Sequence, residues 1–143
     1  MGKILVIGAN GSVGKSCVNN LKDDNDLVLI SRSKFDSDVE GNFEKNVLDI
    51  NDYTNTESFI QSINYEISGI IFAIGSINLK PFSSTSVDDF KKIMDDNFYN
   101  IVHFLNNCIT KMSDSSSVVF FSSIAAVRAV SYTHLRAHET IAN

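Results

Sequence analysis

The stretch that decides the fold is residues 3–16, Lys-Ile-Leu-Val-Ile-Gly-Ala-Asn-Gly-Ser-Val-Gly-Lys-Ser. Residues 4–7 form an unbroken apolar run without alternation, which is typical of a strand buried on both faces. The run ends at Gly8, and from Val13 onward apolar residues recur at helical spacing. The stretch therefore predicts a strand, a glycine-rich turn and a helix in succession. A glycine motif is more specific in this context than it is alone.

Each of the three glycines in this turn has a physical role. Gly8 allows a sharp turn off the strand, Gly11 allows the backbone to approach a pyrophosphate, and Gly14 allows close packing of helix on strand. The N–H groups and the partial positive charge at the helix N-terminus then favour phosphates. The turn therefore predicts a dinucleotide site, whose contacting residues are expected to be Gly8, Asn10, Gly11, Ser12, Val13 and Gly14.

The same turn also resembles a degenerate phosphate loop of the kind found in nucleotide hydrolases. Ala9 stands where that loop has its first glycine. Lys15 would then reach the outer phosphates, and Ser16 would hold a magnesium ion. Such a site also needs a carboxylate, and the later apolar runs end in Ser-Arg, Gly-Ser and Ser-Ser instead. A nucleotide hydrolase and a glycine turn without a ligand are therefore the alternatives to a dinucleotide site.

Length and composition indicate one globular domain. Of the 143 residues, 43% are hydrophobic and 20% are charged, which is ordinary for such a chain. The net charge of −5 and the scattered Lys and Arg residues argue against a nucleic-acid partner. No apolar run approaches the roughly 20 residues of a membrane span, and residues 1–25 lack the apolar core of a signal peptide. We therefore expect a cytoplasmic protein with no membrane partner, in which Cys17 and Cys108 are buried thiols and not a disulfide or metal pair.

Further along the chain, apolar runs alternate with helical patterns. Strands are expected at residues 27–30, 46–50, 69–74 and 118–121, with a polar, helix-poor connection at 31–42 and a turn at 113–117. One helix is expected to begin at Asn51 or Asp52, and a long helix to run from Ser86 to about Met112. The expected apolar stripe of the long helix is Phe90, Ile93, Met94, Phe98, Ile101, Leu105 and Ile109. The pattern predicts an α/β fold, a Rossmann-type doubly wound parallel sheet that is truncated after about the fifth strand.

In such a sheet the first and fourth strands lie side by side, and a crevice opens at the carboxyl ends where the strand order reverses. The candidate cofactor-binding residues at this edge are Ser31, Arg32, Asp49, Ile50, Ala73 and Gly75. An NAD site usually has an acidic residue after the second strand, whereas this chain has Ser31-Arg32. Because a guanidinium pairs with a 2′-phosphate as a fork, the sequence predicts NADP(H) as the cofactor, with NAD(H) as the alternative.

Together these residues resemble the short-chain dehydrogenase/reductase family over about residues 1–127. The resemblance rests on the glycine motif, Arg32, Asp49, Gly75, Asn97 within the long helix and residues 121–126, Phe-Ser-Ser-Ile-Ala-Ala. It implies two catalytic residues: Asn97 supports a water-linked proton relay, and Ser123 polarises the substrate oxygen. It also implies hydride transfer between NADP(H) and a small carbonyl or alcohol substrate, and a full-length parent that is a homo-oligomer.

The chain departs from the family pattern in two places. After the fourth strand the family's Asn-Asn-Ala-Gly is replaced by Phe72-Ala-Ile-Gly75, so only the glycine matches. The family's tyrosine, which acts as general acid and base, would fall at position 136, which is Arg136. Tyr132 with Arg136 imitates the family's Tyr-x3-Lys, but Tyr132 follows Ser123 too soon and arginine does not replace lysine at such a site.

Residues 131–143 also differ in character from the rest of the chain. They show neither a helical stripe nor strand alternation, and they resemble a translated adaptor joined to a truncated reading frame. We therefore expect a dinucleotide-binding domain at 1–130, which is incomplete, and a non-homologous tail at 131–143, in which His134 and His138 hold no metal. The sequence thus predicts an NADP-preferring oxidoreductase that is inactive as it stands, and a non-catalytic dinucleotide-binding or sensor module is the alternative.

Overall fold

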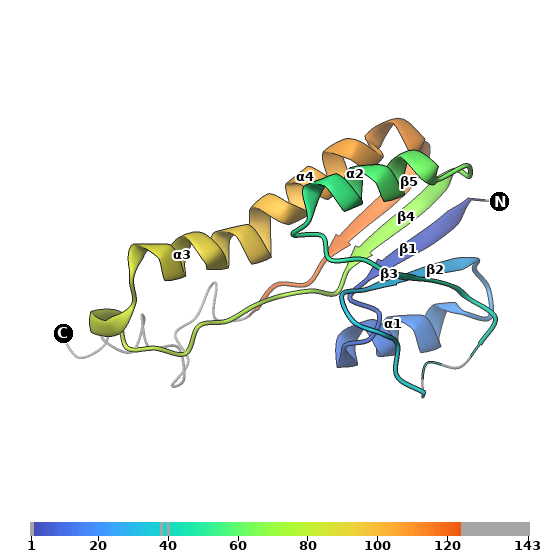
Figure 1. Cartoon of the computed structure of the whole chain (residues 1–143). Coiled ribbons are helices and arrows are strands. Elements are labelled where there is room, and N and C mark those ends of the chain that lie inside the picture. Colours follow the sequence, from blue (N-terminus) through green and yellow to red (C-terminus); the bar gives the residue numbers. More distant parts are fainter. Residues whose placement is uncertain (1, 38, 40, 124–143) are drawn as a thin grey trace.

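Five strands form one parallel sheet in the order β3-β2-β1-β4-β5 in the computed structural model, which describes residues 2–37, 39 and 41–123 (Figure 1). The strands are β1 (Lys3–Ile7), β2 (Leu27–Ser31), β3 (Glu44–Val47), β4 (Ile67–Phe72) and β5 (Met112–Phe120). The main helices are α1 (Ser12–Leu21), α2 (Tyr53–Ser62), α3 (Val87–Met94) and α4 (Asn100–Cys108). The shorter helical segments are η1 (Phe82–Ser84), η2 (Asp95–Tyr99) and η3 (Ile109–Lys111). The predicted Rossmann-type fold class is confirmed.

The helices cover both faces of the sheet, and each face has its own apolar core. Helix α1 lies on one face, and α2 and α4 lie on the other (Figure 1). Alternate residues of β1 supply the two cores, because successive side chains of a strand point to opposite faces. Val6 packs with Val18 of α1 in one core, whereas Leu5 packs with Ile60 of α2 and Phe104 of α4 in the other. This explains why the strand sequences are continuously apolar.

Strand β1 is central because β2 and β4 flank it. Its residues pair with β2 from Ile4 to Ile7 and with β4 from Lys3 to Ile7, in parallel on both sides. The predicted neighbourhood of the first and fourth strands is confirmed. The chain leaves β1 toward β2 on one side, and it returns to β4 on the other side, so the strand order reverses at β1. The loops after the strands therefore meet at one edge of the sheet, where a crevice is expected.

Both helix starts that the sequence predicts are confirmed. Asp52 caps α2, and its carboxylate accepts a hydrogen bond from the Asn55 backbone N–H at 3.0 Å. Ser86 caps α3 in a reciprocal capping box with Asp89. Within the described part of the connection between β2 and β3 there is no helix, as expected.

Strand boundaries differ from the prediction in several places. The third strand occupies Glu44–Val47 and the fourth Ile67–Phe72, each about two residues earlier than predicted. The predicted turn at 113–117 is wrong, because β5 already begins at Met112. The pairing with β4 is nevertheless irregular there: Met112 pairs with Ile67, and the next pair joins Ser117 to Gly69. The polar residues 113–116 therefore bulge out of the ladder instead of ending it.

The apolar stripe predicted for the long helix is also wrong in part. Phe104 and Cys108 are fully buried, whereas Met94, Phe98 and Ile109 are exposed. The helical run contains a π-helical segment, η2, between α3 and α4. A π segment adds a residue to the turn and so shifts the phase of every later position on the helix. The regular spacing assumed from the sequence therefore misses Phe104 and Cys108 beyond η2, although Ile101 and Leu105 pack against the core as expected. Met94 precedes η2 and ends α3, which extends beyond the sheet (Figure 1).

Candidate functional site

A cleft of about 410 Å³ opens at the carboxyl ends of the strands, where the strand order reverses. Many of the predicted cofactor-binding residues line it: Gly8, Asn10, Gly11, Ser31, Arg32, Asp49, Ile50, Ala73 and Gly75. These residues come from four separate loops, after β1, β2, β3 and β4. Ser12, Val13 and Gly14 do not line the cleft themselves, but they form the first turn of α1 beside it.

Two glycines of the turn are required by the fold itself. Gly8 has a φ of +84°, and a Cβ there would lie 2.4 Å from the backbone oxygen of Ala73. A Cβ on Gly14 would lie 2.2 Å from the backbone oxygen of Gly8. Either contact is far too short for real atoms, so these two positions bring the turn against β4 and the helix against the turn. The protein's own packing therefore explains both glycines without any ligand.

Gly11 is different, because the fold leaves room for a side chain there. A Cβ on Gly11 would meet only the Gly8 oxygen, at the ordinary contact distance of 3.4 Å. Gly11 is also the N-cap of α1, and no side chain caps that helix, in contrast to Asp52 on α2 and Ser86 on α3. The uncapped first turn and the open space in front of it fit the diphosphate of a dinucleotide.

The residues at the end of β2 are the candidates for distinguishing NADP(H) from NAD(H). Ser31 is buried and Arg32 is exposed, and both line the cleft. Across the described residues, the Arg32 guanidinium makes neither an ion pair nor a hydrogen bond with protein. A cation held at a cleft in this way fits a phosphate group. On the neighbouring wall, the Asp49 carboxylate accepts a hydrogen bond from the Asn51 N–H at 3.1 Å, which fixes the loop after β3.

Lys15 and Ser16 are not placed as a phosphate loop of a nucleotide hydrolase requires. Neither residue lines the cleft. The Lys15 ammonium lies 2.8 Å from the Asp36 carboxylate. The hydrogen bond from Lys15 and its charge, followed by the Asn10 contact, hold the pKa of Asp36 below its ordinary value. Among the residues that the structure describes, no group of His, Cys, Asp and Glu side chains could hold a metal ion.

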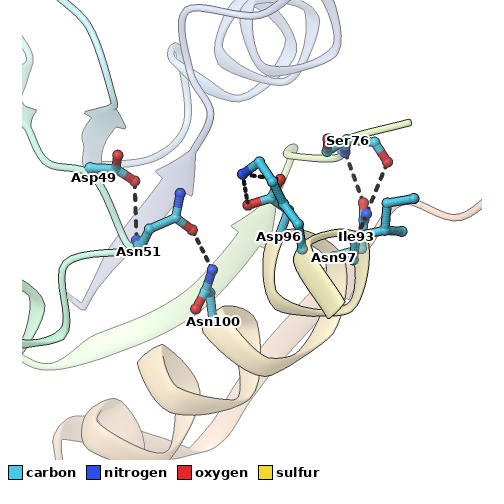
Figure 2. Close-up of polar contacts among 8 residues, drawn as sticks. Asp49, Asn51, Ser76, Ile93, Asp96, Asn97 and Asn100 are labelled. Atoms are coloured by element: carbon cyan, nitrogen blue, oxygen red, sulfur yellow. Dashed lines mark hydrogen bonds and ion pairs between the residues drawn. The ribbon is translucent and has the colours of Figure 1, made fainter. Parts of the chain in front are cut away.

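Asn97 lies in η2 and holds the loop that follows β4 (Figure 2). Its Nδ2 donates to the backbone oxygens of Ser76 at 2.9 Å and Ile93 at 2.8 Å, and its Oδ1 accepts from the Ser76 N–H at 2.8 Å. One side chain thus fixes both backbone groups of Ser76, which lines the cleft. Single π turns within longer helices often occur at functional sites. Here the π segment places Asn97 against the cleft wall.

A second amide pair ties the same helix to the loop after β3. The Asn100 side chain, which is buried, donates to Oδ1 of Asn51 (Figure 2). Three polar residues of the cleft were missed by the sequence interpretation: Ser33, Asn51 and Asp96. Each is a direct neighbour of a predicted residue or segment, so widening each motif by one residue would have included them.

Ser123 follows β5, is exposed, and does not line the cleft. It stands at the same edge of the sheet, because β5 is parallel to β4. Its catalytic role and that of Asn97 stay predictions. Tyr132, His134, Arg136 and His138 lie outside the described residues, so the expectations about them stay predictions as well.

The fold and the cleft define a Rossmann-type dinucleotide-binding domain. Residues 9–138 match the family described as enoyl-(acyl carrier protein) reductase. The chain therefore belongs to the short-chain dehydrogenase/reductase family, as its sequence motifs suggested. No curated protein sequence matches the chain significantly.

Solved structures of this family share the fold. A short-chain dehydrogenase family protein from Francisella tularensis is 21% identical, with a TM-score of 0.77, and the match covers 99% of this chain and 60% of that one. A short-chain dehydrogenase/reductase from Brucella melitensis is 18% identical with a TM-score of 0.81, covering 99% and 65%. A short-chain dehydrogenase from Leptospira borgpetersenii with bound NAD+ is 18% identical with a TM-score of 0.78, covering 90% and 54%. The chain thus spans less than two thirds of the length of each of these relatives.

One further property concerns membranes. None of the helices in the described ranges is both long and apolar enough to cross a bilayer.

Proposed function

We propose that the chain is the cofactor-binding part of an NADP-preferring oxidoreductase that interconverts a small carbonyl compound and its alcohol. The observation that carries the proposal is the pairing of two features in one cleft. The Gly11 turn leaves space for a diphosphate in front of an uncapped helix, and Arg32 offers a cation on the adjoining wall. The bound NAD+ of the Leptospira relative supports a nicotinamide dinucleotide in this cleft.

The loops of the cleft suggest how the cofactor is held. We assign the diphosphate to the glycine turn and the first turn of α1, and the 2′-phosphate to Ser31 and Arg32. The adenine then falls against Asp49 and Ile50, after β3. Ala73 and Gly75, after β4, face the nicotinamide side. This assignment uses each predicted cofactor-binding loop once, and it follows the strand order from β3 to β4 along the edge of the sheet.

The proposed chemistry places the proton steps at the β4 and β5 side of the cleft. When bound, the nicotinamide ring supplies or accepts the hydride. Ser123 would donate a hydrogen bond to the substrate oxygen and stabilise negative charge that develops there. Asn97 would hold the Ser76 backbone and support a chain of water molecules that carries a proton between solvent and the substrate oxygen. The proposed partner is therefore a small carbonyl or alcohol substrate, and the proposal includes no nucleic-acid partner.

We further propose that residues 1–130 form the domain and that residues 131–143 are a non-homologous tail without a catalytic role. The reason is the spacing: Arg136 stands where the family has its tyrosine, and Tyr132 lies too near Ser123. General acid catalysis contributes typically 10²–10⁴-fold and needs the acid within hydrogen-bond reach of the substrate. We therefore expect nucleotide binding without carbonyl reduction above background, which would make this chain act as a binding module. The family match reaches residue 138, so this assignment needs its own test.

Nucleotide binding tests the proposal directly. Calorimetry should show tighter binding of NADPH than of NADH, without a magnesium requirement. The Arg32→Ala variant should weaken NADPH by about 1.5–3 kcal/mol, because a charged hydrogen bond is lost, and should leave NADH nearly unchanged. Equal losses for both nucleotides would show that Arg32 does not contact the 2′-phosphate. Magnesium-dependent ATP hydrolysis that Lys15→Ala abolishes would contradict the proposal as a whole.

Turnover tests the assignment of the tail. The unaltered chain should not oxidise NADPH in the presence of small aldehydes or ketones. Replacing the residues after Ala126 with a natural continuation that supplies Tyr-x3-Lys at the family spacing should restore activity that depends on Ser123. Robust turnover by the unaltered chain that Tyr132→Phe abolishes would refute both the assigned tail and the expected inactivity. A cytoplasmic location and a homo-oligomeric parent belong to the same proposal.

A further inference from the structure

The Asn10 side chain joins the glycine turn to the loop that follows Arg32. Its Nδ2 donates to the backbone oxygen of Lys34 at 3.2 Å. Its Oδ1 accepts from the backbone N–H of Asp36 at 3.0 Å. Both ends of one amide group therefore hold two backbone groups of a loop that is more than twenty residues away in the sequence. A direct nucleotide contact does not account for this arrangement.

Besides the Asn10 bonds, the loop from Arg32 to Asp36 is attached near the cleft by a long hydrogen bond of 3.4 Å from the Ser33 N–H to the Ser31 hydroxyl. It contains no helix, and β2 ends at Ser31, so the strand ladder does not hold it. Phe35 packs at the border of the core that contains Val18 of α1, and it anchors the loop there. The ion pair of Asp36 with Lys15 lies at the surface, with the Asp36 side chain 57% exposed and the Lys15 side chain 25% exposed, and surface pairs contribute little to stability.

The backbone at Arg32 is thus fixed at two points, one on each side. Ser31 is paired in β2 on one side, and the Asn10 bonds hold Lys34 and Asp36 on the other. A long arginine side chain loses rotamer entropy when it binds a phosphate, and a fixed backbone reduces the further ordering that binding requires. Asn10 therefore supplies two of the bonds that hold the loop on the C-terminal side of Arg32.

We propose that Asn10 is a positioning residue that holds the Arg32 loop in place for a 2′-phosphate, and so sets the preference for NADPH over NADH. The inference rests on the proposed cofactor preference. A positioning role and a direct cofactor contact of Asn10 predict different nucleotide affinities when Arg32 is also replaced. A residue that acts through Arg32 has no effect on nucleotide affinity once Arg32 is absent, because coupled residues are not additive.

The experiment compares Asn10→Ala, Arg32→Ala and the double variant in the full chain. Asn10→Ser serves as a second variant that keeps a small polar side chain in the turn. Asn20→Ala is the matched control, because Asn20 also bonds a backbone oxygen, that of Ser16, on the exposed surface of α1. Dissociation constants for NADPH and NADH are measured by calorimetry. The exchange rate of the Asp36 amide hydrogen, measured by NMR without nucleotide, reports on the Asn10 bond itself.

We expect Asn10→Ala to raise the dissociation constant of NADPH by about 5–10-fold and that of NADH by less than about twofold, since the two neutral hydrogen bonds that hold the Arg32 loop are lost. The double variant should bind NADPH no more weakly than Arg32→Ala. The Asp36 amide should exchange several-fold faster in both Asn10 variants and remain unchanged in Asn20→Ala.

The outcomes separate this inference from the proposed function. If Arg32→Ala weakens NADPH selectively while Asn10→Ala and Asn10→Ser do not, the positioning role is refuted and the cofactor preference stands. Equal weakening of both nucleotides by Asn10→Ala, additive with Arg32→Ala, would make Asn10 a direct contact and would also refute the inference. If Arg32→Ala changes neither nucleotide, the cofactor preference itself fails and the inference fails with it.

Discussion

The two halves of the molecule on either side of the β1–β4 junction differ in how their loops are held. In the half formed by β1, α1 and β2, the loops at the cleft are fixed by close backbone approach at Gly8 and Gly14 and by the Asn10 amide. In the half formed by β4, α3, α4 and β5, many large apolar side chains lie exposed. They include Ile77, Leu79, Phe82, Val87, Phe98, Tyr99, Ile109 and Phe120. Helix α3 extends well beyond the sheet in this half (Figure 1).

The two halves are stabilised in different ways. The first half depends on backbone geometry, because its loops tolerate no added atoms at two positions. The second half depends on a few buried side chains, above all the edge-to-face pair of Phe72 and Phe104, whose ring centroids lie 5.9 Å apart. Apolar surface of this extent is typical of regions that contact a ligand or a further part of a protein. Changes in the two halves should therefore have different consequences.

The largest expected effect is on the backbone of the first half. Gly8→Ala places a Cβ against the Ala73 oxygen and forces an alanine to a φ of +84°, so we expect a loss of more than about 4 kcal/mol in the free energy of unfolding. Gly11→Ala is the matched control, because its Cβ meets only ordinary contacts. It should change stability by less than about 1 kcal/mol and still abolish most NADPH binding. Urea unfolding and calorimetry measure the two effects.

Two results would contradict the roles assigned to Gly8 and Gly11. A Gly11→Ala variant that binds NADPH as tightly as the original chain would remove the main support for a diphosphate at this turn. A stable Gly8→Ala variant would show that the turn can shift away from β4.

The second prediction concerns the core of the second half. Phe104 is fully buried, so Phe104→Ala should destabilise the chain by about 3–5 kcal/mol through lost burial and a cavity. Phe98→Ala removes the same ring from an exposed position in η2 and should change stability by about 0.5 kcal/mol or less. Thermal unfolding of both variants measures the difference. Equal effects would mean that the phase shift caused by the π segment does not hold in solution.

Local patterns in the sequence were sufficient for most of the sheet and for the cleft. Unbroken apolar runs predicted the strands, because a parallel sheet covered on both faces leaves no polar side to its strands. Helix caps at Asp52 and Ser86 were readable, because their partners lie within three residues. Most of the cofactor-binding candidates line one cleft, because parallel strands bring all their carboxyl ends to one edge.

The features that the sequence did not predict depend on spacing or on distant partners. The π segment at Asp95–Tyr99 has no compositional signature, although it shifts the helical phase that brings Phe104 into the core. The bulge at 113–116 consists of turn-forming residues inside a strand, which continues because Met112 before them and Ser117 after them pair with β4. The Asn10 bonds join residues far apart along the chain, so no local pattern could reveal them.

The smallest expected effect is electrostatic, and it concerns the capping box of α3 in the second half. Asp89 accepts hydrogen bonds from Lys80 and from the backbone and hydroxyl of Ser86, and these contacts lower its pKa below the ordinary 3.8. Since the folded state favours the ionised carboxylate, Asp89 stabilises the fold above pH 3.8. That contribution is lost as the pH falls toward the lower pKa of the folded state.

Melting temperatures of the original chain and of Asp89→Asn, followed between pH 6 and pH 2, test this prediction. Asp89→Asn should melt at a lower temperature at pH 6, because the amide at this position carries no charge for Lys80 or for the helix N-terminus. The difference should shrink progressively below pH 3.8, because the unfolded chain then takes up a proton at Asp89 that the folded carboxylate resists. Ser86→Ala is the control: it removes the capping hydroxyl, costs about 1 kcal/mol and should retain part of its effect at low pH, since a hydroxyl does not titrate. A difference between the chain and Asp89→Asn that stays constant across the pH range would show that the Asp89 charge does not hold the start of α3, and the second half would then rest on Phe104 and its apolar neighbours alone.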